Sequence, residues 1–120
     1  DTFCMVRDQY RVGFIVITHD LLLARKFCER IVVMYCGRVL ETNAARELFE
    51  HPRHPYTQGL IASLPHLGMK PMAGFSPAFT DQPSGCVFHP RCPYAEARCR
   101  HTEPKSIPCG EGSVCCHRYA

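Results

Sequence analysis

Long apolar runs are missing from this chain of 120 residues. No stretch approaches the roughly 20 apolar residues of a membrane-spanning helix, and none has the pattern of a secretory signal peptide. Without such a signal we expect a reducing compartment, which disfavours disulfides and favours metal for clustered cysteines. The chain starts at Asp1 rather than Met, inside a segment typical of a helix, so we expect further residues upstream.

A large excess of charge of one sign is also missing. The formal net charge is +3; residues 1–50 carry seven basic and seven acidic side chains, and residues 51–120 carry seven and four. This basic surplus is too small and too dispersed to indicate a phosphate-rich partner. We therefore expect no binding of nucleic acid.

Large apolar residues are scarce after Ser84. They are only Val87, Phe88, Tyr94, Ile107, Val114 and Tyr119. Ordering each residue costs about 1–2 kcal/mol of backbone entropy, more than this small set can offset. The last third of the chain therefore needs a cross-link: disulfides, zinc or an iron–sulfur cluster.

Four cysteines in this segment are the most informative feature of the sequence. Cys86, Cys92, Cys99 and Cys116 have the spacing C-x5-C-x6-C-x16-C, and together they can form a four-sulfur cage. The spacing differs from that of bacterial ferredoxins, and it fits poorly the close ligand pairs of zinc fingers. Taken alone it leaves iron–sulfur and zinc equally open, with disulfides less favoured.

The first half of the chain has the pattern of a piece of α/β core. Residues 12–18 form a continuous apolar, β-branched run, which predicts a strand buried on both faces as in a parallel sheet. Asp20 is a good N-cap for the helix expected next. The further expected elements are the end of a crossover helix with its connecting turn over 1–11, a helix over 21–29, a strand over 31–35, a turn at Gly37 and a returning strand over 38–41.

Proline and asparagine mark the elements that follow. Asn43 is expected to cap a short helix over 44–50, which Pro52 stops. Pro55 is expected at the first position of a helix that runs to Leu64. Residues 67–85 have the composition of a loop, so the segment from 67 to 120 is expected to be a linker and a loop-rich extension.

The triplet Thr18-His19-Asp20 is the first candidate for chemistry. It lies at the carboxyl end of the strand predicted over 12–18 and directly before a helix N-terminus. Ligands bind at that edge of open α/β sheets, and the free N–H groups of a helix start favour anions. A neutral His19 there can hydrogen-bond a terminal phosphate.

Several runs together resemble one family. Residues 13–21 (GFIVITHDL) and 31–41 (IVVMYCGRVLE) resemble the switch-histidine strand and following hairpin of ABC transporter ATPases. Residues 47–60 (ELFEHPRHPYTQGL) resemble the histidine-proline-tyrosine segment of oligopeptide and dipeptide importer ATPases. The tail, 83–93 (PSGCVFHPRCP) through 114–117 (VCCH), is similar to the C-terminal extension of the same family.

The resemblance implies a function and its cofactors. The intact subunit would bind ATP with Mg²⁺ and power peptide uptake, with His19 contacting the γ-phosphate and Asp20 supporting contact with a second ATPase subunit. Its other partners would be transmembrane permeases, at the cytoplasmic face of the membrane. The resemblance also implies a [4Fe–4S] cluster on Cys86, Cys92, Cys99 and Cys116, with zinc as the alternative metal and Cys115 as the alternative fourth ligand.

The same resemblance divides the chain into three parts. Residues 1–50 would be the end of the ATPase core, residues 51–66 a helical bridge with the His54-Pro55-Tyr56 motif, and residues 67–120 the linker and cysteine-rich extension. The sequence departs from the family in lacking the phosphate-binding loop G-x-x-x-x-G-K-[ST]. We therefore expect the chain alone to be inactive as an ATPase. The competing hypothesis is a stand-alone metal-binding interaction module.

Overall fold

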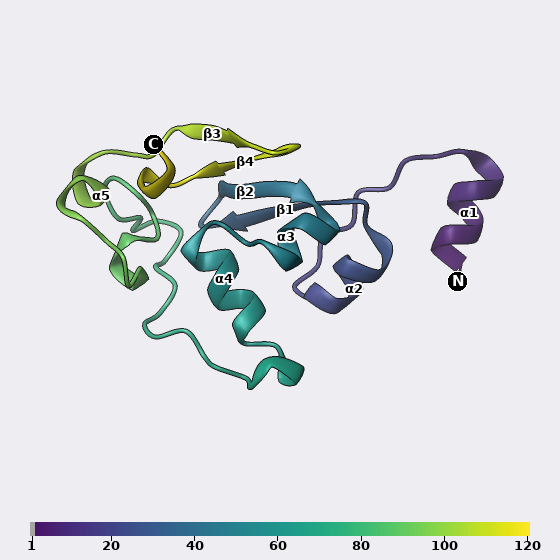
Figure 1. The fold of residues 1–120 in the computed structure, drawn as a ribbon, viewed down its shortest axis with the longest axis horizontal. Helices are drawn as coiled ribbons and strands as arrows, with labels where there is room; N and C mark the ends of the chain where they lie inside the picture. Colours follow the sequence, from purple (N-terminus) through teal and green to yellow (C-terminus); the bar gives the residue numbers. More distant parts are fainter. Residues whose placement is uncertain (1) are drawn as a thin grey trace.

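A small antiparallel sheet organises the chain, as a computed structural model of residues 2–120 shows (Figure 1). Its strands are ordered β1-β2-β4-β3, so the C-terminal hairpin pairs with the hairpin from the first half of the chain. The strands are β1 (Arg30–Tyr35), β2 (Arg38–Ala44), β3 (Ser106–Cys109) and β4 (Gly112–Cys115). The α-helices are α1 (Thr2–Tyr10), α2 (Leu21–Phe27), α3 (Ala45–Glu50), α4 (Pro55–Ala62) and α5 (Ala97–His101). Single turns of 3₁₀-helix are η1 (Pro65–Leu67), η2 (His89–Arg91) and η3 (His117–Tyr119).

The β1–β2 hairpin confirms the expected turn at Gly37. Cys36 and Gly37 have positive φ of 49° and 76°, and Tyr35 pairs with Arg38 across the turn. Two central residues with positive φ form the tight turn whose twist matches that of the flanking strands. The second strand is longer than expected and continues through Ala44, which leaves enough of it to pair with β4.

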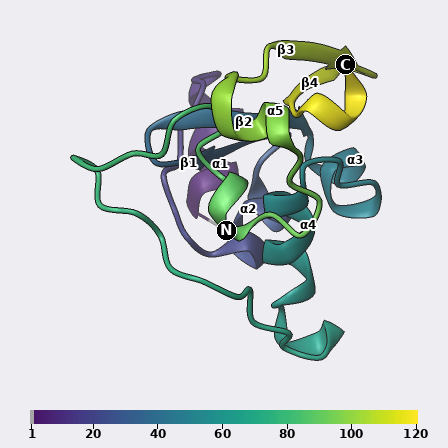
Figure 2. The same ribbon diagram turned by 90° about the vertical axis from the view of Figure 1, so that its left-hand side faces the viewer.

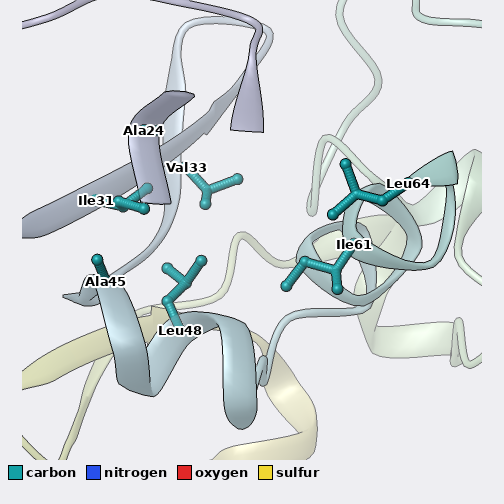
Figure 3. Packing of buried hydrophobic residues seen from close by; sticks show 7 residues of the cluster. All are labelled: Ala24, Ile31, Val33, Ala45, Leu48, Ile61 and Leu64. Atoms are coloured by element: carbon teal, nitrogen blue, oxygen red, sulfur yellow. The ribbon is translucent and has the colours of Figure 1, made fainter. Parts of the chain in front are cut away.

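Side chains alternate along β1, so one face of the hairpin is covered. Ile31, Val33 and Tyr35 are buried, whereas Val32 and Met34 are exposed. Helices α2, α3 and α4 pack on the buried face (Figure 3). The cluster shown there consists of Ala24, Ile31, Val33, Ala45, Leu48, Ile61 and Leu64.

A second buried cluster joins the hairpin to the cysteine-bearing tail. It consists of Tyr35, Leu40, Cys86, Val87 and Phe88. Tyr56 packs against both clusters from the start of α4. The few large apolar residues of the tail therefore form a core jointly with the first half of the chain.

The tail hairpin, β3–β4, was not anticipated from the sequence. In the middle of the sheet, Glu41 and Thr42 of β2 pair with Val114 and Ser113 of β4. At Gly112 the two backbones come so close that an added Cβ would overlap the carbonyl of Thr42. The pairing thus requires glycine at this position.

The strand predicted over residues 12–18 is wrong. These residues belong to no helix or strand, and Ile15 and Ile17 are 95% and 97% exposed. An apolar run forms a strand only where neighbouring strands accept its hydrogen bonds. In the described part of the chain the strands pair with one another and none flanks this run.

The predicted helices are largely confirmed. Helix α1 lies where a helix was expected and stands apart from the sheet at one end of the molecule (Figure 1). Helix α2 begins after Asp20, as expected, and α4 has Pro55 in its first turn but ends at Ala62, before Leu64.

The expected cap of the helix after β2 is wrong. Asn43 is a residue of β2, and its Oδ1 accepts a hydrogen bond from Ala44 N at 2.9 Å. Ala44 occupies the N-cap position of α3 without a side-chain hydrogen bond. Pairing with β1 extends the strand to Ala44, so the helix starts one residue later than the sequence suggested.

The linker between η1 and the tail contains no helix or strand, as expected. It runs in a wide arc outside the helices, which is clearest in the turned view (Figure 2). Among residues 2–120 no helix is long and apolar enough to cross a membrane.

Candidate cysteine site

Four cysteines line one small cavity in the tail, and we refer to Cys86, Cys92, Cys99 and Cys116 as the cysteine quartet. Cys86 and Cys92 flank η2, Cys99 lies in α5, and Cys116 follows β4. All four are free thiols. The tail hairpin returns the chain to the cavity, so sheet pairing brings the fourth cysteine to the other three. We call the cavity that the quartet lines the cysteine cavity.

The backbone closes the loop that carries the first three cysteines. Cys86 N donates to Cys99 O at 2.8 Å, and Cys92 N donates to His89 O at 3.3 Å. Gly85 has φ +69°, and an added Cβ would stand 2.5 Å from Cys99 O. A glycine is therefore needed directly before Cys86 for this closure.

The cavity wall is poorly solvated. Burial raises the pKa of the thiols of Cys86, Cys92 and Cys116, and nearby thiols of the quartet raise each of them further. The guanidinium of Arg118 acts in the opposite direction on Cys92 and Cys116. Four thiolates gathered here would repel one another unless a bound cation offsets their charge.

Cys115 lies elsewhere. It lines a second cavity, whose wall includes Arg38, Glu103 and also Cys86 of the quartet, and Ser106 hydrogen-bonds its thiol. The neighbouring Cys116 is the one that lines the cavity of the quartet. Among residues 2–120, no group of three or more His, Cys, Asp or Glu side chains is arranged to hold a single metal ion.

His19 and Asp20 are not brought to the cysteine cavity. Both are exposed and precede α2, which lies at the opposite end of the sheet from α5 (Figure 1). Asp20 Oδ1 accepts a hydrogen bond from Leu23 N at 3.0 Å, and Thr18 Oγ1 accepts one from Asp20 N at 3.0 Å. The structure thus shows Asp20 as the N-cap of α2.

Glu41 was not anticipated from the sequence as a residue near the site. Its side chain is 1% exposed, and its carboxylate accepts hydrogen bonds from two successive backbone amides, Arg53 N and His54 N, each at 2.9 Å. Because Glu41 lies in β2, these bonds fix the start of α4 against the sheet. No sequence signal marks Glu41, since its two partners lie more than ten residues downstream.

His54 was expected only to take part in the helical bridge, but it is also a wall of the cysteine cavity. It is 1% exposed, and its Nδ1 accepts a hydrogen bond from Tyr56 N at 3.0 Å. The centroid of its ring lies 5.6 Å from that of the Phe88 ring. A sequence signal existed: Pro55 has no N–H, so a capping side chain at position 54 bonds the next amide.

The described fold combines a helix that begins at the His-Pro-Tyr motif, a cavity lined by four cysteines and one small antiparallel sheet. Residues 40–99 match the family model of the oligopeptide/dipeptide transporter, C-terminal region. The chain therefore belongs to this family. The matched range contains the His-Pro-Tyr motif and Cys86, Cys92 and Cys99, whereas His19 and Cys116 lie outside it.

Curated relatives carry related names. The dipeptide transport ATP-binding protein DppD of Haemophilus influenzae is 42% identical over 111 residues, which are 88% of this chain and 34% of that protein. Its namesake in Caldanaerobacter subterraneus is 38% identical over 120 residues, which are 95% of this chain and 37% of that protein. The Escherichia coli protein of the same name is 41% identical over 104 residues, which are 82% of this chain and 32% of that protein.

The chain thus spans about a third of the length of the relatives that it matches. Each of these three relatives is named a dipeptide transport ATP-binding protein. The alternative hypothesis of a stand-alone metal-binding module is not supported, because the similarity extends over nearly the whole chain.

Proposed function

We propose that this chain is part of the ATP-binding subunit that powers uptake of dipeptides or oligopeptides by an ABC importer. The observation that carries the proposal is the match of residues 40–99 to the peptide-transporter family, joined to relatives named as dipeptide transport ATP-binding proteins. The intact subunit uses ATP with Mg²⁺, pairs with a second ATPase subunit and docks on permeases at the cytoplasmic face of the membrane.

In this role the chain has three parts. Residues 1–50 complete the ATPase core, residues 51–66 form the helical bridge, and residues 67–120 form the linker and the extension. His19 contacts the γ-phosphate, and Asp20 supports the contact between the two ATPase subunits. The exposure of both residues in the described chain leaves them accessible to such partners.

The test of this part is steady-state ATP hydrolysis by the full-length subunit in its importer. His19→Ala is expected to lower kcat by about a hundredfold or more, the usual loss for one transition-state hydrogen bond. The matched control is His66→Ala, because His66 is also exposed but lies in η1, far along the chain. Equal activity of the two variants would refute the role of His19.

A test of Asp20 needs a variant that distinguishes its role as the N-cap of α2 from its role in contact between subunits. Asp20→Asn keeps an oxygen that can cap α2 but removes the negative charge. A slowed ATPase with unchanged helix stability supports a role of the charge in contact between subunits. An ATPase at the wild-type rate leaves Asp20 with its capping role alone and refutes that part of the proposal.

We propose further that the cysteine quartet holds a [4Fe–4S] cluster. The support is the donor set: four free thiols line one small cavity. Zinc–sulfur bonds of about 2.3 Å would require the sulfur atoms to lie within roughly 4 Å of one another. A cluster is a larger body than a single ion and spaces its thiolates more widely, so the two groups require different distances between the sulfur atoms.

When bound, the cluster cross-links the four thiolates and can accept or release an electron. The chain's own contribution is to close the loop before Cys86 and to return Cys116 through the tail hairpin. The cross-link supplies stability that the few apolar residues of the tail do not.

The test is the iron, acid-labile sulfide and zinc content of the full-length protein purified without air. We expect about four irons and four sulfides per chain, by the formula of the cluster. Cys116→Ser is expected to lose them, and the adjacent Cys115→Ser, as matched control, to retain them. One zinc per chain without iron would refute the cluster and favour the zinc alternative.

A further inference from the structure

The buried imidazole of His54 has one nitrogen in use and one without a partner. Nδ1 accepts the backbone N–H of Tyr56 at 3.0 Å, so Nδ1 carries no proton. The remaining proton of a neutral ring is therefore on Nε2. Burial lowers the pKa of His54 to about 4, so the ring is neutral near pH 7.

The Nε2–H of His54 is buried and makes no hydrogen bond within residues 2–120. A buried donor without a partner costs about 1–3 kcal/mol, so such groups are rare in native proteins. Three other buried polar atoms lack partners in the described chain, on Tyr35, Asn43 and Thr57. None of these residues lines the cysteine cavity, whereas His54 does.

The two other histidines of the cavity wall have partners. His89 Nδ1 lies 2.9 Å from Cys86 O, and His117 Nε2 lies 2.7 Å from Thr102 O. His54 is therefore the histidine with a free donor at this cavity among residues 2–120. Its position is fixed by backbone bonding to Glu41 and by its ring contact with Phe88.

We infer that the Nε2–H of His54 donates a hydrogen bond to a sulfur of the group that the cysteine quartet holds. The inference rests on the proposed cluster and gives the histidine of the His-Pro-Tyr motif a chemical role there. A hydrogen bond to a thiolate or sulfide stabilises the more negative, reduced state of a cluster and so raises its reduction potential. His54 is thus a positioning and tuning residue that links the helical bridge to the metal site.

Two substitutions distinguish the roles of the two ring nitrogens of His54. His54→Asn places a side-chain oxygen where Nδ1 caps α4 but removes the distant donor. His54→Gln extends an NH₂ group to the region of Nε2 and leaves the cap unfilled. A structural role of His54 predicts that the Asn variant resembles the wild type, whereas the donor role predicts that the Gln variant does.

The experiment is a redox titration of the full-length holoprotein, followed by electron paramagnetic resonance, together with iron and sulfide analysis. For His54→Asn we expect a roughly tenfold lower equilibrium constant of reduction, which is a potential about 59 mV more negative for one electron. For His54→Gln we expect a potential close to that of the wild type. An unchanged potential in His54→Asn overturns the inference.

A second measurement uses the wild-type protein, so it tests the inference even if a variant fails to take up iron. Pulsed electron paramagnetic resonance of the reduced wild-type protein, with isotopically labelled histidine, is expected to show coupling of one imidazole nitrogen to the cluster. Absence of that coupling, or its persistence in His54→Gln, overturns the role of His54 while leaving the cluster intact. A wild-type protein with no iron and sulfide overturns the cluster proposal itself, and the inference with it.

Discussion

Replacing Phe88 by alanine tests whether the tail is held by its shared core. Phe88 is 1% exposed. The centroid of its ring lies 5.4 Å from that of Tyr35, 5.6 Å from that of His54 and 5.3 Å from that of Tyr56. Removing a buried phenyl group costs about 3–5 kcal/mol, from lost burial and the cavity left behind. That is a large part of the roughly 5–15 kcal/mol that stabilises a domain.

The assay is hydrogen exchange of the purified protein, read on peptides from the second buried cluster. At about 1.4 kcal/mol per tenfold, the loss corresponds to exchange faster by about a hundredfold to a few thousandfold. Phe88→Leu keeps most of the volume and is expected to cost less than about 1.5 kcal/mol. Phe75→Ala is the matched control, because Phe75 is 93% exposed and its loss is expected to change stability by less than about 0.5 kcal/mol.

One result would refute the reasoning. If Phe88→Ala and Phe75→Ala speed exchange equally little, the tail is not stabilised by packing of Phe88 against the aromatic rings of the first half. The order of the cysteine cavity would then not depend on this packing.

Three further predictions concern other parts of the sheet and its helices. Gly112→Ala is expected to separate the tail hairpin from β2, because the new methyl group overlaps the carbonyl of Thr42; faster exchange in β4 checks this, and Gly13→Ala is the control, since an added Cβ at Gly13 meets no atom within 4 Å. Glu41→Gln is expected to cost about 1–3 kcal/mol, because an amide N–H₂ then faces one of the two backbone donors that the carboxylate satisfies; unchanged exchange at the start of α4 would contradict it. Asp20→Ala is expected to cost about 1 kcal/mol of local stability in α2, and Asp20→Asn much less, as measured by exchange of the α2 amides.

Local signals in the sequence predicted the local elements well. Asp20 before an apolar segment indicated the start of α2, and Pro55 indicated the first turn of α4. Gly37 between two strand-like runs indicated the turn, and Cys36 and Gly37 adopt the positive φ that such a turn needs. In each case the determining contacts lie within a few residues of one another, so the sequence alone carries the information.

The failures involve partners that lie far away in the chain. The apolar run over 12–18 has the composition of a buried strand, but no described strand flanks it. Asn43 has the side chain of a helix cap, but pairing with β1 holds it in β2. Pairing with other strands decided both outcomes over the local preference: the run over 12–18 has no strand partner in the described chain, whereas Asn43 has one in β1.

The sequence by itself determined the candidate residues of the tail: four cysteines at a spacing suited to a four-sulfur cage, and a His-Pro-Tyr segment before a helix. Only the tertiary structure decided that these two features meet. Cys116 reaches the cavity because β4 pairs with β2, and His54 reaches it because Glu41 of that same strand binds the start of α4. Both contacts join residues distant in sequence, and such contacts depend on how the elements pack rather than on any local pattern.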